Sequence, residues 1–135
     1  MSPLLVFYFL IYSLAAQSGP VCEKCDMETV RITRENISAL TFERVQDFLC
    51  IFDESCAGDY EFYRASNETL FDVVYKAPET FLKVLQFGEL KNHELIFEEL
   101  GAPAHAGIDV EVVRARIKEQ DEKYMFKYDV LSALD

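Results

Sequence analysis

The chain has 135 residues and a formal net charge of −11, which arises from 24 acidic and 13 basic side chains. So acidic a surface repels phosphate backbones and anionic lipid headgroups, which argues against nucleic-acid binding and electrostatic membrane docking. Half of the residues are hydrophobic and 13% are aromatic, a composition too apolar for a disordered acidic tail. We therefore expect one folded domain with a hydrophobic core.

The N-terminal segment is typical of a secretory signal peptide. Residues 1–14 read MSPLLVFYFLIYSL, an apolar stretch that is long enough for the core of a signal peptide but shorter than the ~20 residues that span a bilayer. Small residues follow at Ala15, Ala16 and Ser18, so we expect residues 1–18 to be removed and the mature protein to be secreted without a membrane span. No Lys or Arg precedes the apolar run, which leaves a retained short anchor as the alternative.

Four cysteines follow, at Cys22, Cys25, Cys50 and Cys56. Because thiols in the secretory pathway are normally oxidised in pairs, we expect two structural disulfides rather than a four-thiolate zinc site. A bond from either early cysteine to either late one closes a loop of about 30 residues and stabilises by ~4 kcal/mol, against ~2 kcal/mol for a bond within Cys22-x-x-Cys25. Cross-pairing is therefore predicted, and both the nested and the crossed arrangement satisfy it.

The segment 19–37 contains the CxxC sequence and is predicted to be an extended N-terminal arm. Within it Val30 and Ile32 alternate with charged neighbours, as in a short strand. From residue 38 the apolar spacing becomes helical, and Ser38 or Thr41 is expected to cap the first helix. The inner stripe of this helix comprises Phe42, Val45, Leu49 and Phe52.

More helices are predicted along the remaining chain. We expect a short aromatic helix at 60–65, a new helix from Ser66 or Asn67, and another that begins at Pro78 and ends at Gly88. Asn92 and Asp109 are expected to cap the next two helices. The stripes predicted for the later helices are His93, Ile96, Phe97 and Leu100, then Val110, Val113 and Ile117, then Tyr124, Tyr128, Leu131 and Leu134.

These patterns predict an all-α fold, a compact bundle of five or six short helices in a domain of residues 38–135, with a disulfide-pinned N-terminal arm. Apolar residues at the centre of each stripe should form the core. We expect four of them to be nearly fully buried, namely Leu49, Phe71, Phe81 and Phe97.

No catalytic, metal or cofactor site is predicted. His93-Glu94 opens like the helical zinc-protease motif, but Phe97 occupies the position of its second histidine. His105 lies alone in a loop, with Asp109 as the nearby acid. The sequence also contains three pairs of adjacent acids. Because adjacent side chains on a helix point apart, we interpret these pairs as solvated surface rather than as the two carboxylates of a glycosidase. The pairs are Asp53-Glu54, Glu98-Glu99 and Asp121-Glu122.

Two sequences fit the acceptor pattern for N-linked glycans. They are Asn36-Ile37-Ser38 and Asn67-Glu68-Thr69. Both lie where a helix is predicted to begin, and both asparagine side chains are therefore expected to be exposed. Glycosylation at Asn36 and Asn67 would agree with secretion.

The leading functional hypothesis is a small secreted, non-enzymatic protein that binds an unidentified protein or lipid partner through its helical surface. The alternative is lipid binding, because the early Cys22-x-x-Cys25, the amphipathic helices and the acidic character resemble saposin-like proteins. The saposin pattern has six cysteines with two near its end, whereas no cysteine follows Cys56 here. A third hypothesis is a thiol oxidoreductase that uses the CxxC pair, although such a site normally lies between a buried strand and a helix.

Overall fold

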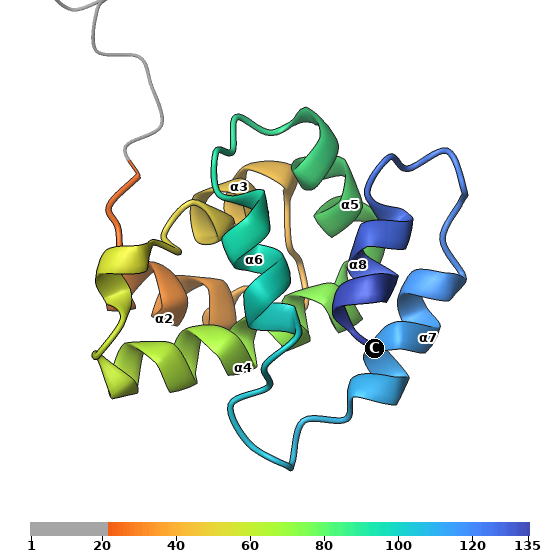
Figure 1. The fold of residues 1–135 in the computed structure, drawn as a ribbon. Helices are drawn as coiled ribbons and strands as arrows, with labels where there is room; N and C mark the ends of the chain where they lie inside the picture. Colours follow the sequence, from red (N-terminus) through yellow and green to blue (C-terminus); the bar gives the residue numbers. More distant parts are fainter. Residues whose placement is uncertain (1–21) are drawn as a thin grey trace, which may run out of the picture.

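The computed structural model describes residues 22–135, so the predicted signal peptide at 1–18 lies outside the described residues. Within this range the chain forms seven α-helices and one short 3-10 helix, and it contains no strand (Figure 1). The elements are α2 (Met27–Glu35), α3 (Phe42–Leu49), η1 (Glu54–Cys56), α4 (Tyr60–Lys76), α5 (Pro78–Phe87), α6 (His93–Leu100), α7 (Val110–Lys118) and α8 (Lys127–Ala133). The all-α class is confirmed here, with more helices than the five or six expected.

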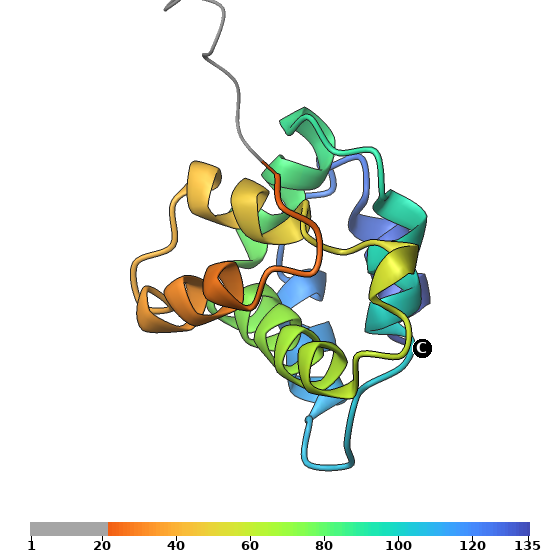
Figure 2. The same cartoon turned by 90° about the vertical axis from the view of Figure 1, so that its left-hand side faces the viewer.

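The longest helix, α4, lies at the centre of the packing. It contacts α2, α5, α6 and α7, while α3 packs on α5 and α8 packs on α6 and α7. In Figure 2, α2 (orange) and α6 (teal) lie on opposite sides of α4 (green). Because neighbours surround it, α4 buries more than one stripe. Its buried residues are Phe62, Ser66, Asn67, Thr69, Leu70, Phe71, Val73 and Val74.

The predicted extended arm is wrong for residues 27–35, which form α2. Asp26 caps this helix by accepting a hydrogen bond from the amide of Glu28. The buried residues of α2 are Val30 and Thr33, three positions apart, whereas Ile32 is only half-buried. The alternation that resembled a strand instead reflects charged residues on the outer face, where Arg31 pairs with Glu28 and Glu35.

The predicted break near residue 66 is also wrong, because α4 is continuous from Tyr60 to Lys76. Asp59 caps it by accepting a hydrogen bond from the amide of Phe62. Ser66 and Asn67 lie within the helix and are buried. Polar residues that often begin helices are accommodated here because their side chains bond to groups inside the fold.

Several predicted helix boundaries are confirmed. Thr41 and Asp109 accept hydrogen bonds from the amides of Arg44 and Val112, Pro78 begins α5, and Gly88 follows its last residue. Asn92 immediately precedes α6, but its side chain does not cap the helix. Its amide Nδ2 instead donates to the carbonyls of Leu49 and Phe52, both at 2.9 Å, and so ties α6 to the end of α3.

Three of the four residues singled out for the core are confirmed as buried: Leu49, Phe71 and Phe81. Phe97 is only half-buried, at the edge of the core, so its predicted burial is wrong. In the stripe predicted for the last helix, Tyr124 and Leu134 are buried as expected, but Tyr128 is 59% exposed and Val130, which is not in that stripe, is buried. None of the helices described between residues 22 and 135 is both long and apolar enough to cross a membrane.

Candidate functional site

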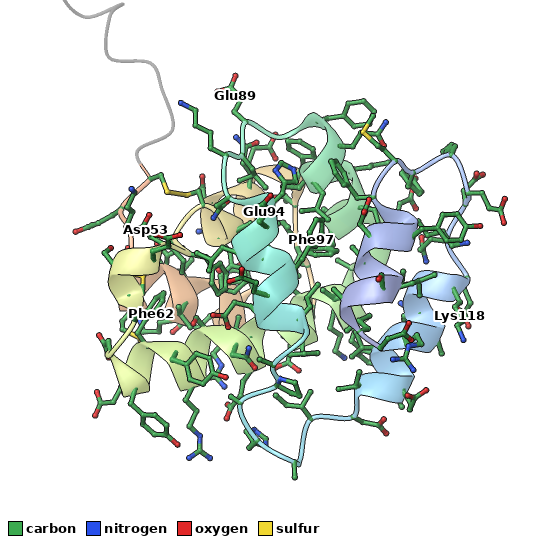
Figure 3. The ribbon with its side chains drawn as sticks, viewed as in Figure 1. Asp53, Phe62, Glu89, Glu94, Phe97 and Lys118 are labelled. Atoms are coloured by element: carbon green, nitrogen blue, oxygen red, sulfur yellow. A yellow bond between two sulfur atoms is a disulfide. The ribbon has the colours of Figure 1, made fainter. Side chains whose placement is uncertain are left out.

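A surface depression lies between η1, the first half of α4 and α6, and we call it the η1–α4–α6 cavity. Its volume is about 400 Å³. Figure 3 labels Asp53 and Phe62, which lie on this side of the molecule. The apolar part of the lining consists mainly of Phe52, Cys56, Phe62 and Leu95. Polar side chains complete the lining, namely Asp53, Glu54, Asp59, Tyr60, Tyr63, Ser66 and Glu99.

Local sequence shapes one wall of this cavity. Asp53 caps η1 by accepting a hydrogen bond from the amide of Ser55 at 3.0 Å, and Cys56 ends that short helix. Gly58 then adopts a φ of 98°, a left-handed conformation that residues with a side chain rarely adopt. The chain reverses at this glycine and enters α4 at Tyr60. Gly58 therefore supplies the left-handed conformation in the link between η1 and α4.

The two disulfides hold this wall to the N-terminal segment. Cys22 is bonded to Cys50 and Cys25 to Cys56, so the predicted cross-pairing is confirmed and is of the crossed type. The amide of Cys25 also donates to the carbonyl of Ile51 at 2.8 Å. The two cysteines of the CxxC sequence thus have different partners, and they do not form the single reversible disulfide that CxxC oxidoreductases use.

The acidic groups at the cavity differ in their surroundings. Hydrogen bonds from Ser55 and then from Lys24 lower the pKa of Asp53 to about 2, so this rim carboxylate is ionised. Burial raises the pKa of Glu99, although the hydrogen bond from Asn67 opposes that effect. Glu98 is exposed and Glu99 is half-buried. The interpretation of Glu98-Glu99 as a solvated pair is therefore wrong for Glu99.

Asn67 connects α4 to the chain that follows α6. Its Nδ2 donates to the Glu99 carboxylate at 2.8 Å and to the Glu99 and Ala102 carbonyls, while its Oδ1 accepts from the amide of Ala104 at 2.8 Å. The side chain is fully buried, which contradicts its expected exposure. An N-linked glycan would occupy Nδ2, so this fold has no room for one at Asn67. Asn36 is exposed, and its glycosylation stays a prediction.

A second polar cluster surrounds Glu68, on the opposite face of α4 from Ser66. The Glu68 carboxylate contacts Arg64 at 3.2 Å, Arg34 at 3.1 Å and His105 Nε2 at 2.9 Å. His105 Nδ1 accepts a hydrogen bond from the amide of Gly107 at 3.0 Å, so in the neutral ring the proton lies on Nε2 and points at Glu68. His105 thus links the loop between α6 and α7 to α4 through Glu68.

His93 and the remaining acids show no shared chemical arrangement. The His93 ring stacks on Phe126 with centroids 4.9 Å apart, and its Nε2 donates to the Leu85 carbonyl at 2.6 Å. Asp121 and Glu122 are exposed. Between residues 22 and 135, no group of three or more His, Cys, Asp or Glu side chains is placed to hold a metal ion.

Stability should depend on pH through Glu68. Burial opposes ionisation, but the hydrogen bond from Arg64 and the charges of His105 and Arg34 lower the net pKa of this carboxyl. The pKa of Glu68 is lower in the folded protein than in the unfolded chain. Its ionised carboxylate therefore stabilises the fold above the unfolded-state pKa, and this stabilisation is lost as the pH falls through the folded-state pKa. Glu68→Gln should therefore cost ~1 kcal/mol at pH 7, with a smaller cost near pH 3, measured by urea unfolding.

The matched control for this prediction is Glu98→Gln, which removes the same charge from an exposed position. Its stability difference from the parent protein should be close to zero at neutral pH. Equal effects of the two substitutions, or a Glu68→Gln cost that grows as the pH falls, would contradict the role of the Glu68 cluster.

The chain matches no family model, and comparisons with curated proteins and with solved structures find no significant similarity. The functional proposal is therefore built on the geometry of the cavity and on the chemistry of its side chains.

Proposed function

We propose that this is a secreted, non-enzymatic binding protein that holds a small, largely apolar ligand in the η1–α4–α6 cavity. The observation that carries this proposal is the apolar lining of the cavity, which includes Phe52, Phe62 and Leu95 and surrounds a volume of about 400 Å³. Pockets that bind small molecules typically enclose ~300 to 1,000 Å³ and are mostly apolar, with a few polar groups that orient the ligand. This cavity has both properties.

The covalent structure around the cavity also supports binding. Cys56 lines it and is bonded to Cys25, which fixes η1 against the segment that leads into α2. A wall that is ordered before binding loses little conformational entropy when the ligand enters, and this increases affinity. The two disulfides and the absence of a membrane-spanning helix among residues 22–135 agree with a secreted protein.

The cavity favours ligand binding over the initial hypothesis of a partner bound through the helical surface. Outside the cavity, the exposed apolar side chains include Phe87 and Met125, which are 67% and 65% exposed. These residues belong to adjoining segments, joined by a hydrogen bond from the Met125 amide to the Gln86 side chain at 3.2 Å. The cavity combines apolar walls with polar groups that can orient a ligand.

Binding can be tested with the uncharged fluorescent probe N-phenylnaphthylamine. We expect saturable fluorescence enhancement by the purified, oxidised protein. Leu95→Gln should weaken probe binding by about tenfold, because it replaces an apolar wall of the cavity with a polar one. The matched control is Leu90→Gln, which alters another half-buried leucine outside the lining. Absence of saturable binding, or equal effects of both substitutions, would overturn the proposal.

A further inference from the structure

The η1–α4–α6 cavity is chemically asymmetric. Part of its wall is formed by apolar side chains such as Phe52, Phe62 and Leu95, while carboxylates occur at its rim and on its α6 wall. The rim carboxylates are those of Asp53, Glu54 and Asp59, and the wall carboxylate is that of Glu99. No Lys, Arg or His contributes to the lining itself, although Lys24 pairs with the Asp53 carboxylate at 3.0 Å. A ligand that complements this surface needs an apolar body and a positive charge at one end.

Glu99 is the group that best defines the position of that charge. Its Oε2 accepts a hydrogen bond from Asn67 at 2.8 Å, and no other described side chain donates to the carboxylate. Within residues 22–135 it forms no ion pair, although ten ion pairs occur elsewhere in that range. A half-buried carboxylate without a cation is electrostatically uncompensated. A ligand ammonium at the cavity wall would supply the missing charge.

Aromatic rings around the cavity add a second preference for cations. Tyr60 is 66% exposed and Tyr63 half-buried, and both line the cavity together with Phe52 and Phe62. The faces of aromatic rings attract ammonium groups. The Tyr63 hydroxyl donates its proton to the Ala102 carbonyl at 3.0 Å, so its oxygen keeps lone pairs that can accept an N–H donor. An anionic headgroup would find no comparable partner in this lining.

We infer that the ligand of the η1–α4–α6 cavity is an amphipathic amine, with its apolar body on Phe52, Phe62 and Leu95 and its ammonium beside Glu99. This inference rests on the proposed ligand-binding function and adds the charge class of the ligand. The overall charge of −11 acts in the same direction, because it attracts cations and repels anions at longer range.

Three probes of equal chain length separate charge from apolar contact: n-octylamine, n-octanol and octanoate. Isothermal titration calorimetry of the oxidised protein at neutral pH, below the aggregation concentration of each probe, should give the tightest binding for the amine. Octanol should bind about tenfold more weakly, since the neutral hydroxyl lacks the charge-assisted contact with Glu99. Octanoate should bind most weakly of the three.

Variants at neighbouring positions test the assignment of Glu99. Glu99→Gln keeps an oxygen that can accept from Asn67 but removes the charge, and it should weaken octylamine binding by about tenfold while leaving octanol binding unchanged. The matched control is Glu98→Gln, because Glu98 is exposed and outside the lining. It should leave the affinities for both probes unchanged.

The outcomes distinguish this inference from the proposed function. If octanol or octanoate binds at least as tightly as octylamine, or if Glu99→Gln and Glu98→Gln act equally, the charge inference is overturned while ligand binding in the cavity stands. If none of the three probes binds and N-phenylnaphthylamine also fails to bind, both proposals are overturned. Preferred amine binding that is lost only in Glu99→Gln supports both.

Discussion

Removal of both disulfides is expected to destabilise the protein by ~6 kcal/mol, most of the stability of a typical small domain. The bonds Cys22–Cys50 and Cys25–Cys56 span 28 and 31 residues, so either alone restricts the unfolded chain by ~4 kcal/mol. The crossed loops overlap. Once one bond is present, the other closes an effective loop of only about 9 residues and adds ~2.5 kcal/mol.

The paired variants Cys22→Ser/Cys50→Ser and Cys25→Ser/Cys56→Ser should therefore each lose only ~2.5 kcal/mol, measured by urea unfolding against the parent protein. The variant that lacks all four cysteines should lose more than their sum. Trypsin cleaves after Lys24 and separates Cys22 from Cys25, and an acid-specific protease that cleaves after Asp53 or Glu54 separates Cys50 from Cys56. Peptides that remain linked under non-reducing conditions would then show the crossed pairing directly. Strictly additive losses, or a Cys22–Cys25 bond, would contradict this account.

Phe81→Ala is expected to cost ~3 to 5 kcal/mol of unfolding free energy, because it removes a large, fully buried ring from the core. Phe81 lies on α5, the helix that packs on both α3 and α4. Neighbours on two sides limit how far the site can collapse around the missing ring. The midpoint of urea unfolding should fall with little change in its slope.

Phe97→Ala provides the comparison at a half-buried site. The Phe97 ring lies near the rings of His93 and Phe126, at centroid distances of 6.5 and 6.1 Å, on the side of α6 toward α8 (Figure 3). On folding, Phe97 removes less apolar surface from water than Phe81 does. Phe97→Ala should therefore lower the unfolding free energy by about half as much as Phe81→Ala. Equal losses for the two substitutions would show that Phe97 belongs to the core in solution.

Helical structure and most helix boundaries could be predicted from the sequence because their causes are local. Thr41 and Asp109 bond to amides within their own first turns, and Pro78 and Gly88 act through backbone geometry. The failures also have identifiable causes. Val30 and Ile32 suggested a strand because the short window hid the helical spacing of Val30 and Thr33.

The candidate site could be predicted only in part, since its two sides come from distant segments. Cys56 and Phe62 meet Leu95 and Glu99 across more than 30 residues of sequence. No local pattern marks Glu99 as different from Glu98, because both belong to the same acidic pair on α6. Asn67 likewise resembles an exposed helix start until the chain after α6 returns to bond with it.

The sequence by itself determined the acidic charge, the helical class, most helix ends and the pairing of early with late cysteines, since composition, short-range hydrogen bonding and loop entropy depend on the chain alone. The tertiary structure decided the choice of crossed pairing, the burial of Asn67, the partial exposure of Phe97 and the cavity beside Glu99. Each of these depends on contacts between segments far apart in the chain, and such contacts exist only after the helices have packed around α4.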